Sequence, residues 1–264
     1  YGDTVLHGVL RWQKHLSSGS IEVTWLFLAV ALALLPFFQF FRGTPHQLAA
    51  VKELEESVPK ELLEEDAAWF EAWRASGIDQ EIYMPKYFKQ LDNFSGAGYR
   101  ECFSSAAAMV ASFWGKVKTD DEYNLHREKF GDTTSVQAQL DALSALGLNA
   151  EFRQDGDADM IELEIENGRP VLVGWLHKGN LLQGEPPMCS SSTCGHWSVI
   201  TGYAGKHSND PEWVMFDPAG YPDMIQGGHE ESLSGRRVRV RQSEFYQRWQ
   251  VDGPKTGWVI LVDG

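Results

Sequence analysis

A cysteine, a histidine and an aspartate occur along the chain in settings that suit thiol chemistry. Cys102 opens an alanine-rich run, His196 opens an apolar run, and Asp217 follows the next apolar run. A thiol becomes a good nucleophile when an imidazole takes its proton, and a carboxylate behind the imidazole orients it. We therefore expect an acyl-transfer enzyme with Cys102 as nucleophile, His196 as general base and acid, and Asp217 as orienting partner.

The elements predicted around these residues would bring them together. The small, apolar run 102–114 predicts a buried helix, whose N-terminus offers free N–H groups and the positive end of the helix dipole to the thiol. The alternating run 196–203 predicts a strand that begins with the histidine, and 213–216 predicts the strand before the aspartate. A thiol facing an imidazole in this way would form a thiolate–imidazolium pair.

The segments that carry these residues resemble one family. From about residue 83 to residue 262 the chain is similar to the papain-like cysteine peptidases, and within them to the branch related to the leader peptidases of bacteriocin exporters, peptidase family C39. The similar segments are 89–93, 102–109, 168–173, 195–203, 216–218, 245–249 and 257–260. The resemblance implies the same roles for Cys102, His196 and Asp217. It adds Gln90, whose side-chain amide would join the Cys102 N–H in an oxyanion hole.

Some features depart from that family's pattern. Phe103 follows the cysteine, where many relatives have Gly or Asn, and a long insertion from His177 to Cys194 precedes the histidine. The loop from Gln90 to Cys102 is also fairly long. These departures keep every catalytic group but leave the substrate open, because loops around a cleft set specificity.

The order of predicted elements favours an α+β fold. Helices are predicted at 102–114, 119–130 and 135–146, and strands at 82–85, 150–152, 170–175, 197–203, 212–216, 236–240 and 258–262. Helices that precede most of the strands indicate segregated layers rather than a doubly wound sheet. The family resemblance implies a papain-like fold, with the cysteine on a central helix packed on an antiparallel sheet.

The chain divides into three predicted parts. Residues 1–43 form an N-terminal segment, residues 44–79 a helical stalk, and residues 80–264 the peptidase domain. Within the first part, 23–41 carries no charge and as a helix would reach about 28 Å, close to the hydrocarbon thickness of a bilayer. This stretch either crosses a membrane or packs against protein, and the sparse flanking charge leaves the side of the membrane open.

Charge narrows the choice of partners. A formal net charge of −14 argues against nucleic acid as the main partner. The acidic stretch 155–166 is interpreted as a solvated face. The basic run 236–241 either pairs with acid of the same chain or binds an acidic ligand or lipid headgroup. We expect a peptide or protein substrate, and the oligomeric state stays open.

Cysteine and histidine spacing argues against a metal site. Cys189, Cys194 and His196 have the loose spacing C-x4-C-x-H, and zinc would consume the proposed base. No obvious fourth ligand lies nearby, although His177 or His207 would be a candidate. The two loop cysteines could instead close a small disulfide, which would leave Cys102 as the free thiol. The proposed chemistry requires no cofactor.

Two other functions remain open on the same fold. The domain would act as a peptidoglycan-crosslink hydrolase if the loops around the cleft accept cell-wall peptides. Alternatively, it is a catalytically inactive module for membrane attachment or assembly. A complete set of Cys102, His196, Asp217 and Gln90 argues against loss of activity.

Overall fold

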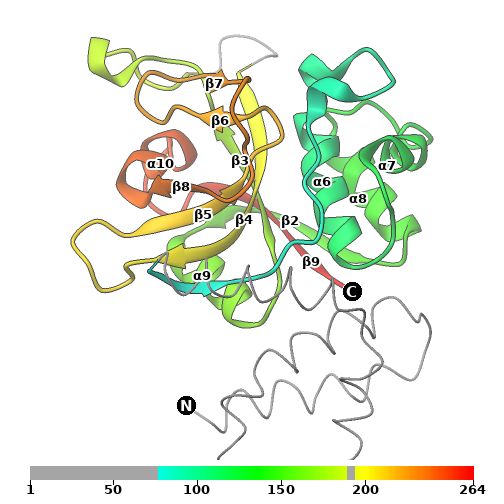
Figure 1. The fold of residues 1–264 in the computed structure, drawn as a ribbon, viewed down its shortest axis with the longest axis horizontal. Coiled ribbons are helices and arrows are strands. Elements are labelled where there is room, and N and C mark those ends of the chain that lie inside the picture. The colour runs from blue at the N-terminus through cyan, green and yellow to red at the C-terminus, as the bar shows by residue number, and fades with distance from the viewer. Residues whose placement is uncertain (1–76, 189–193) are drawn as a thin grey trace, which may run out of the picture. The chain divides into compact units, whose positions relative to one another are not determined.

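The computed structural model describes residues 77–188 and 194–264, in which a seven-stranded antiparallel sheet has helices against both faces (Figure 1). The N-terminal segment 1–43, its candidate span 23–41 and nearly all of the predicted stalk lie outside the described residues. Within the described part, no helix combines the length and the apolar character needed to cross a bilayer. The α+β fold class predicted from the sequence is confirmed.

Three helices follow one another in the first half of the described chain, as predicted. They are α6 (Cys102–Phe113), α7 (Asp120–Arg127) and α8 (Val136–Ala145). The hydroxyls of Thr119 and Ser135 accept backbone N–H groups in the first turns of α7 and α8, which is why these helices begin where they do. In α6 nearly every side chain after Cys102 is buried, since small residues allow this helix to pack closely on the sheet.

The sheet has the strand order β2-β9-β3-β4-β5-β8, and every neighbouring pair is antiparallel. Its strands are β2 (Asn149–Gly156), β3 (Val171–Leu176), β4 (Gly195–Ala204), β5 (Glu212–Phe216), β8 (Val238–Arg241), β9 (Gly257–Asp263) and β1 (Ile78–Glu81). The short β1 pairs with the last residues of β4, beyond the stretch that β3 covers. A separate two-stranded sheet joins β6 (Tyr221–Pro222) to β7 (His229–Glu230).

Two hydrophobic cores lie on opposite faces of the sheet. Helices α6, α7 and α8 stand on one side, while α9 (Ala158–Glu166) and α10 (Gln242–Trp249) stand on the other (Figure 1). Alternate residues of a strand serve alternate cores: Leu172 belongs to the α6 side, and its neighbours Val171 and Val173 to the α9 side. Because the central strands β3 and β5 are buried on both faces, their sequences are almost continuously apolar.

The structure differs from the sequence-based prediction at the first strand. We predicted a strand at 82–85, but the residues that pair are 78–81. Ile82 and Met84 are buried by packing, and only Ile82 continues the pairing, through its N–H to the carbonyl of Thr201 at 2.7 Å. The apolar residues at 82 and 84 therefore mark a buried segment rather than a strand. The three-part division of the chain stays a prediction.

Helices α9 and α10 were not predicted. The acidic stretch that we interpreted as a solvated face forms α9, with Asp157 accepting the Met160 N–H at its start. Ile161 and Ile165 are buried on the inner side of that helix, and Glu164 is buried beside them in an ion pair with Arg169. The stretch is therefore only partly a solvated face. The basic run forms the edge strand β8, which starts at Val238, two residues later than expected.

The basic edge strand pairs with acid of the same chain. Arg239 forms an ion pair with Glu212, and Arg241 lies 3.0 Å from Asp210 and 3.2 Å from Glu244. The first of the two alternatives for this run is therefore the one observed.

One buried arginine ties three segments together. Arg248 on α10 is fully buried, and its guanidinium donates hydrogen bonds only to backbone carbonyls. The acceptors are Leu176, Lys178, Gly179, Met224 and Ile225, at 2.7–3.3 Å. Leu176 ends β3, Lys178 and Gly179 follow it, and the last two precede β7. Arg248 therefore holds the residues around His177 close to the loop that leads to His229.

Replacing Arg248 with Met should lower the free energy of unfolding by about 3 kcal/mol, because several buried carbonyls lose their donor. Urea denaturation of the purified chain measures this change. As a matched control, Arg241→Met removes exposed ion pairs and should cost less than about 1 kcal/mol. Equal effects of the two substitutions would show that the buried arginine has no special structural role.

Candidate functional site

Cys102 is the first residue of α6 and lies against the strand that carries His196. A hydrogen bond from the backbone N–H of Trp197 reaches the Cys102 sulfur. The next residue, Phe103, stacks on the Trp197 ring with centroids 3.9 Å apart and planes 6° apart. Phe103 is buried in the core, which explains the departure from the family pattern: its side chain joins α6 to β4. The thiol is thus held beside the backbone position next to the imidazole.

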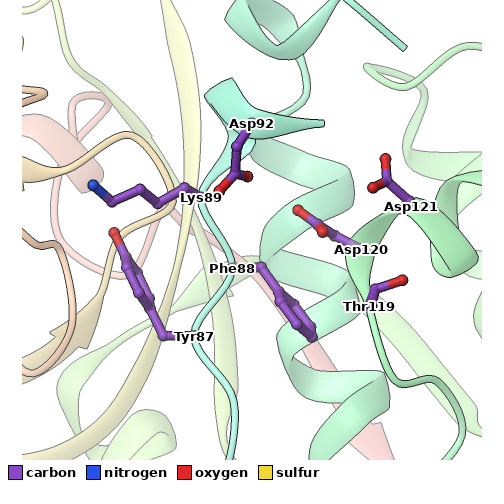
Figure 2. Close-up of a pocket in the computed structure, with 7 residues that line it drawn as sticks. All are labelled: Tyr87, Phe88, Lys89, Asp92, Thr119, Asp120 and Asp121. Carbon is purple, nitrogen blue, oxygen red and sulfur yellow. The ribbon is translucent and has the colours of Figure 1, made fainter. Parts of the chain in front are cut away.

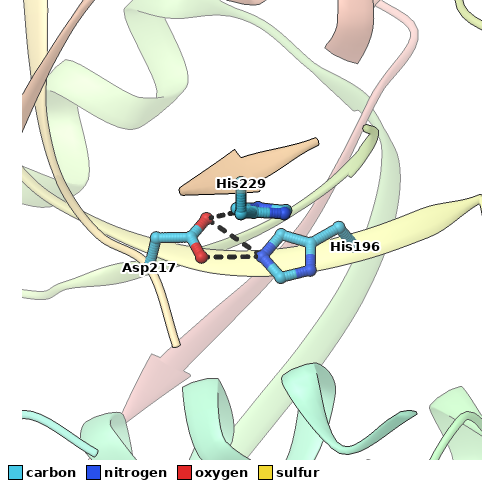
Figure 3. Close-up of side chains that lie close together, drawn as sticks. All are labelled: His196, Asp217 and His229. Carbon is cyan, nitrogen blue, oxygen red and sulfur yellow. Dashed lines mark hydrogen bonds and ion pairs between the residues drawn. The ribbon is translucent and has the colours of Figure 1, made fainter. Parts of the chain in front are cut away.

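His196 and Asp217 form a buried pair. The Nε2 atom of His196 lies 3.0 Å from Oδ1 and 2.9 Å from Oδ2 of Asp217 (Figure 3). Both side chains are almost fully buried, at 3% and 0% exposure. Since a carboxylate only accepts, Nε2 must donate, and a neutral ring then has its lone pair on Nδ1. This second nitrogen points away from the carboxylate in Figure 3, so it is the one that can receive a proton from a thiol.

The carboxylate of Asp217 is fixed by further donors. The Ser198 hydroxyl donates to Oδ2 at 2.8 Å, and the Ala219 N–H donates to Oδ1 at 2.9 Å. Ser198 itself accepts the indole N–H of Trp175 at 2.9 Å. Ser198 lies two residues after His196 and therefore on the same side of β4, which places both against one acid.

The segment before α6 is attached to the turn that carries Asp217. The Tyr87 hydroxyl donates to the backbone carbonyl of Asp217 at 2.9 Å, and the Gln90 N–H donates to the carbonyl of Pro218 at 2.9 Å. Gln90 begins the short 3-10 helix Gln90–Asp92, and its side-chain amide donates to the Gly98 carbonyl at 2.9 Å. That carbonyl lies in the 3-10 turn just before α6. The structure therefore brings Gln90 to the start of α6, with one amide hydrogen committed to Gly98.

Burial sets the protonation preferences of the thiol and the imidazole. Burial raises the pKa of the Cys102 thiol to about 11, although backbone hydrogen bonds from Trp197 and Phe103 lower it again in part. Burial also lowers the pKa of His196, against the opposing attraction of Asp217. Both effects favour a neutral thiol beside a neutral imidazole. Burial therefore opposes the thiolate–imidazolium pair expected from the sequence, because that expectation considered the helix dipole but not the loss of solvent.

Asp217 has the opposite preference. Burial alone would raise its pKa, but the nearby charges of His196 and His229 and the hydrogen bond from His196 outweigh this effect and hold the pKa well below its usual range. The carboxylate therefore stays ionised over the whole physiological range. An ionised acid behind the ring stabilises any imidazolium that forms on His196 during a reaction.

A second histidine at the site was missed by the sequence-based reasoning. His229 on β7 lies with its Nε2 3.4 Å from Asp217 Oδ2, and its ring centroid is 4.3 Å from that of His196. His177 lies nearby, with ring centroids 5.6 Å from His196 and 5.3 Å from His229. The sequence Gly227-Gly228-His229 is typical of a turn, and no local signal marks it as part of a site. Its position depends on the pairing of β6 with β7.

The described cysteines include one free thiol and one disulfide-bonded sulfur, as the sequence analysis considered. Cys102 is a free thiol, whereas Cys194 is disulfide-bonded. Cys189 lies outside the described residues. A disulfide-bonded sulfur cannot ligate zinc as a thiolate, so the C-x4-C-x-H arrangement loses a ligand. The described residues whose ligand atoms converge are instead His196, Asp217 and His229.

A separate pocket of about 480 Å³ borders the segment that leads to Gln90. Figure 2 shows its lining residues, which are Tyr87, Phe88, Lys89, Asp92, Thr119, Asp120 and Asp121. Burial raises the pKa of Asp120 to about 6, and the Ser105 hydroxyl donates to it at 2.9 Å. Neither Cys102 nor His196 lines this pocket, which touches the site only through Tyr87 and its neighbours.

The chain is similar to several solved structures that are described as peptidases. One is described as a C39-like peptidase from Bacillus anthracis, with 13% identity, a TM-score of 0.48, and coverage of 70% of this chain and 98% of that one. Another is the peptidase domain of Streptococcus ComA, a bifunctional ABC transporter involved in quorum sensing, with 18% identity, a TM-score of 0.38, and coverage of 62% and 90%.

A third is a double-glycine motif protease from an AMS/PCAT transporter, solved in complex with the leader peptide. It has 17% identity, a TM-score of 0.39, and coverage of 70% of this chain and 94% of that one. No curated protein sequence matches the chain.

The family comparison is more specific than these structural likenesses. The model of the Peptidase C39-like family matches residues 84–254, a range that contains the thiol, the imidazole, the carboxylate and the glutamine described above. This match spans more than half of the chain. The chain therefore belongs to the Peptidase C39-like family and is a cysteine peptidase.

Proposed function

We propose that Cys102, His196, Asp217 and Gln90 hydrolyse an amide bond in a peptide or protein substrate. The observation that carries this proposal is the orientation of His196. Its Nε2 is held by a buried carboxylate, while the backbone of the following residue contacts the Cys102 sulfur. An imidazole fixed in this way offers its other nitrogen as a base next to a thiol.

The first half of the reaction forms an acyl-enzyme. The Cys102 sulfur attacks the carbonyl carbon as its proton passes to Nδ1 of His196, and the carbonyl π electrons move to the oxygen. Asp217 stabilises the imidazolium and so offsets part of the cost of burying the positive charge of His196. His196 then protonates the leaving amine as the C–N bond breaks. The thiol needs no standing negative charge before substrate arrives.

The second half restores the enzyme. A water molecule attacks the thioester carbon while His196 accepts a proton from the water. The C–S bond then breaks, the acid product is released, and His196 returns the proton to the sulfur of Cys102. In both halves the negative oxygen is stabilised by the N–H of Cys102, which has no partner within its helix, and by the second amide hydrogen of Gln90. The bonds of Gln90 to Gly98 and Pro218 support this role, because they hold the glutamine near the start of α6.

The loops around the cleft decide which substrate class presents the amide bond. Peptide crosslinks of bacterial cell walls would react by the same steps, and incubation with purified peptidoglycan, followed by mass analysis of released fragments, separates that activity from proteolysis. Attachment to a membrane through 23–41 also remains a proposal. Extraction of the full chain from membranes by detergent, but not by salt, would support it, and release by salt alone would contradict it.

Cys102→Ala should abolish both peptide cleavage and labelling by iodoacetamide in the native chain, because it removes the proposed nucleophile. Mass spectrometry of peptide mixtures incubated with each variant measures the cleavage. The matched control replaces Cys189 and Cys194 together, which removes the other sulfurs without leaving an odd thiol. Turnover that persists in Cys102→Ala would exclude this mechanism.

Gln90→Ala separates the oxyanion role from the nucleophile. We expect turnover to fall by about 10²–10³-fold, the usual cost of one oxyanion donor. Labelling of Cys102 by iodoacetamide should change little, because alkylation creates no oxyanion. If labelling fell in parallel with turnover, Gln90 would act on the structure around the thiol rather than on the reaction.

Alkylation of Cys102 should accelerate with pH. Because burial raises the thiol pKa to about 11, the thiolate fraction of the native chain grows about tenfold for each pH unit below that value. The rate of iodoacetamide labelling should therefore rise continuously from pH 6 to pH 9. The urea-unfolded chain, with a thiol pKa of about 8.5, supplies the reference curve. A rate independent of pH between 6 and 8 would instead reveal a standing thiolate–imidazolium pair.

A further inference from the structure

Three potential metal ligands converge at the centre of the site. Nε2 of His196, a carboxylate oxygen of Asp217 and a ring nitrogen of His229 all lie within 4.8 Å of one another. The two imidazole nitrogens are 2.9 Å and 3.4 Å from Oδ2 of Asp217. Ligand atoms at 2.0–2.1 Å from a tetrahedral ion stand about 3.3 Å apart, so small shifts would let one ion contact all three. Figure 3 shows both rings directed at the same carboxylate.

His229 supplies an independent observation. Its side chain is only 6% exposed, and its Nε2 lies 3.4 Å from Asp217 Oδ2 without making a hydrogen bond of good geometry to any described residue. A buried nitrogen whose nearest contact is this long gains little from it, and in the tautomer protonated on Nδ1 the Nε2 lone pair would face the carboxylate and be repelled by it. A cation between the two groups removes both penalties. The nitrogen, the acid and a second imidazole together form the ligand set that zinc accepts.

The ligands are also supported as metal ligands usually are. Ser198 and Ala219 donate hydrogen bonds to the Asp217 carboxylate, which leaves it oriented but still able to share electron density with an ion. Arg248 holds the loop before β7, and β6 pairs with the strand that carries His229. Such outer contacts fix ligand orientation in known metal sites.

We propose that His196, Asp217 and His229 form a binding site for a divalent transition-metal ion of the zinc class, and that the bound ion inhibits the peptidase. Three protein ligands leave the fourth position of a tetrahedral ion to water. The site is a regulatory one, because the reaction itself uses His196 in its metal-free form.

Inhibition follows from the histidine tautomer and rests on the proposed function. When Nε2 of His196 binds a metal ion, the single proton of the neutral ring must stand on Nδ1. That nitrogen can then no longer accept the proton of Cys102. The bound cation also removes Asp217 from its partnership with the ring. Metal binding and thiol chemistry therefore exclude each other.

The test uses Co²⁺, whose visible absorption reports tetrahedral coordination, in a titration of the full chain carrying Cys102→Ala. This background removes the thiol as a ligand and makes the result independent of catalysis. We expect an absorption band with a one-to-one endpoint, displaced by Zn²⁺. His229→Asn in the same background should weaken binding by more than about tenfold, since even outer-contact losses cost 10–100-fold in metal affinity. The matched control, His207→Asn, should leave affinity unchanged.

Two results would overturn the proposal: equal affinity in the His229→Asn and His207→Asn chains, or loss of binding in Cys102→Ala relative to the unaltered chain. The second result would assign the ion to the thiol.

Urea midpoints of the variants confirm that each is folded. Because His229→Asn could disturb β7, the melting temperature is also measured with and without Zn²⁺: stabilisation of the Cys102→Ala chain but not of His229→Asn supports the site. Inhibition of turnover by Zn²⁺ in the unaltered chain, reversed by a chelator, then tests the regulatory part separately.

Discussion

The buried contact between His196 and Asp217 is the constraint around which the site is organised. A carboxylate with no solvent exposure must be compensated by donors, and Asp217 has the imidazole, a hydroxyl and a backbone N–H around it. Those donors lie on β4 and on the turn after β5. The pair therefore requires the two strands to be adjacent, and it ties one tautomer of the ring to the register of the sheet.

The helix that carries the thiol is positioned by packing. Phe103 on Trp197 is a stacked pair within the core, so rotation or sliding of α6 against β4 would break a buried aromatic contact as well as the hydrogen bond to the sulfur. The same burial makes charge expensive on Cys102 and on His196. In the proposed mechanism the proton therefore stays on sulfur until the substrate arrives, and charge develops only where Asp217 can stabilise it.

The loops around Asp217 contribute further polar side chains to the site. His229 and His177 come from segments separated by about fifty residues, and Arg248 joins the backbones of both segments through its carbonyl contacts. The fold thus surrounds one carboxylate with more imidazole than a nucleophile site requires. That excess is the feature that a metal ion can use, and it lies on the side of the ring opposite the nitrogen needed for proton transfer.

The sequence by itself determined much of the local structure and the order of the chemical groups. A cysteine at the start of a small-residue helix, a histidine at the start of an alternating run and an Asp-Pro after a short apolar strand are local patterns, and the structure has α6, β4 and β5 at those places. Periodicity reports which side of an element is buried, so these elements were predictable. The roles of Cys102, His196, Asp217 and Gln90 stay predictions.

Only the tertiary structure decided the rest. The place of His229, the Arg248 contacts and the bond from Gln90 to Gly98 depend on segments that meet through folding, and no local pattern specifies such a meeting. The preferred protonation of the thiol and imidazole was also decided there. A pKa responds to lost solvent and to charges in three dimensions, whereas a run of residues shows only what stands next in the chain.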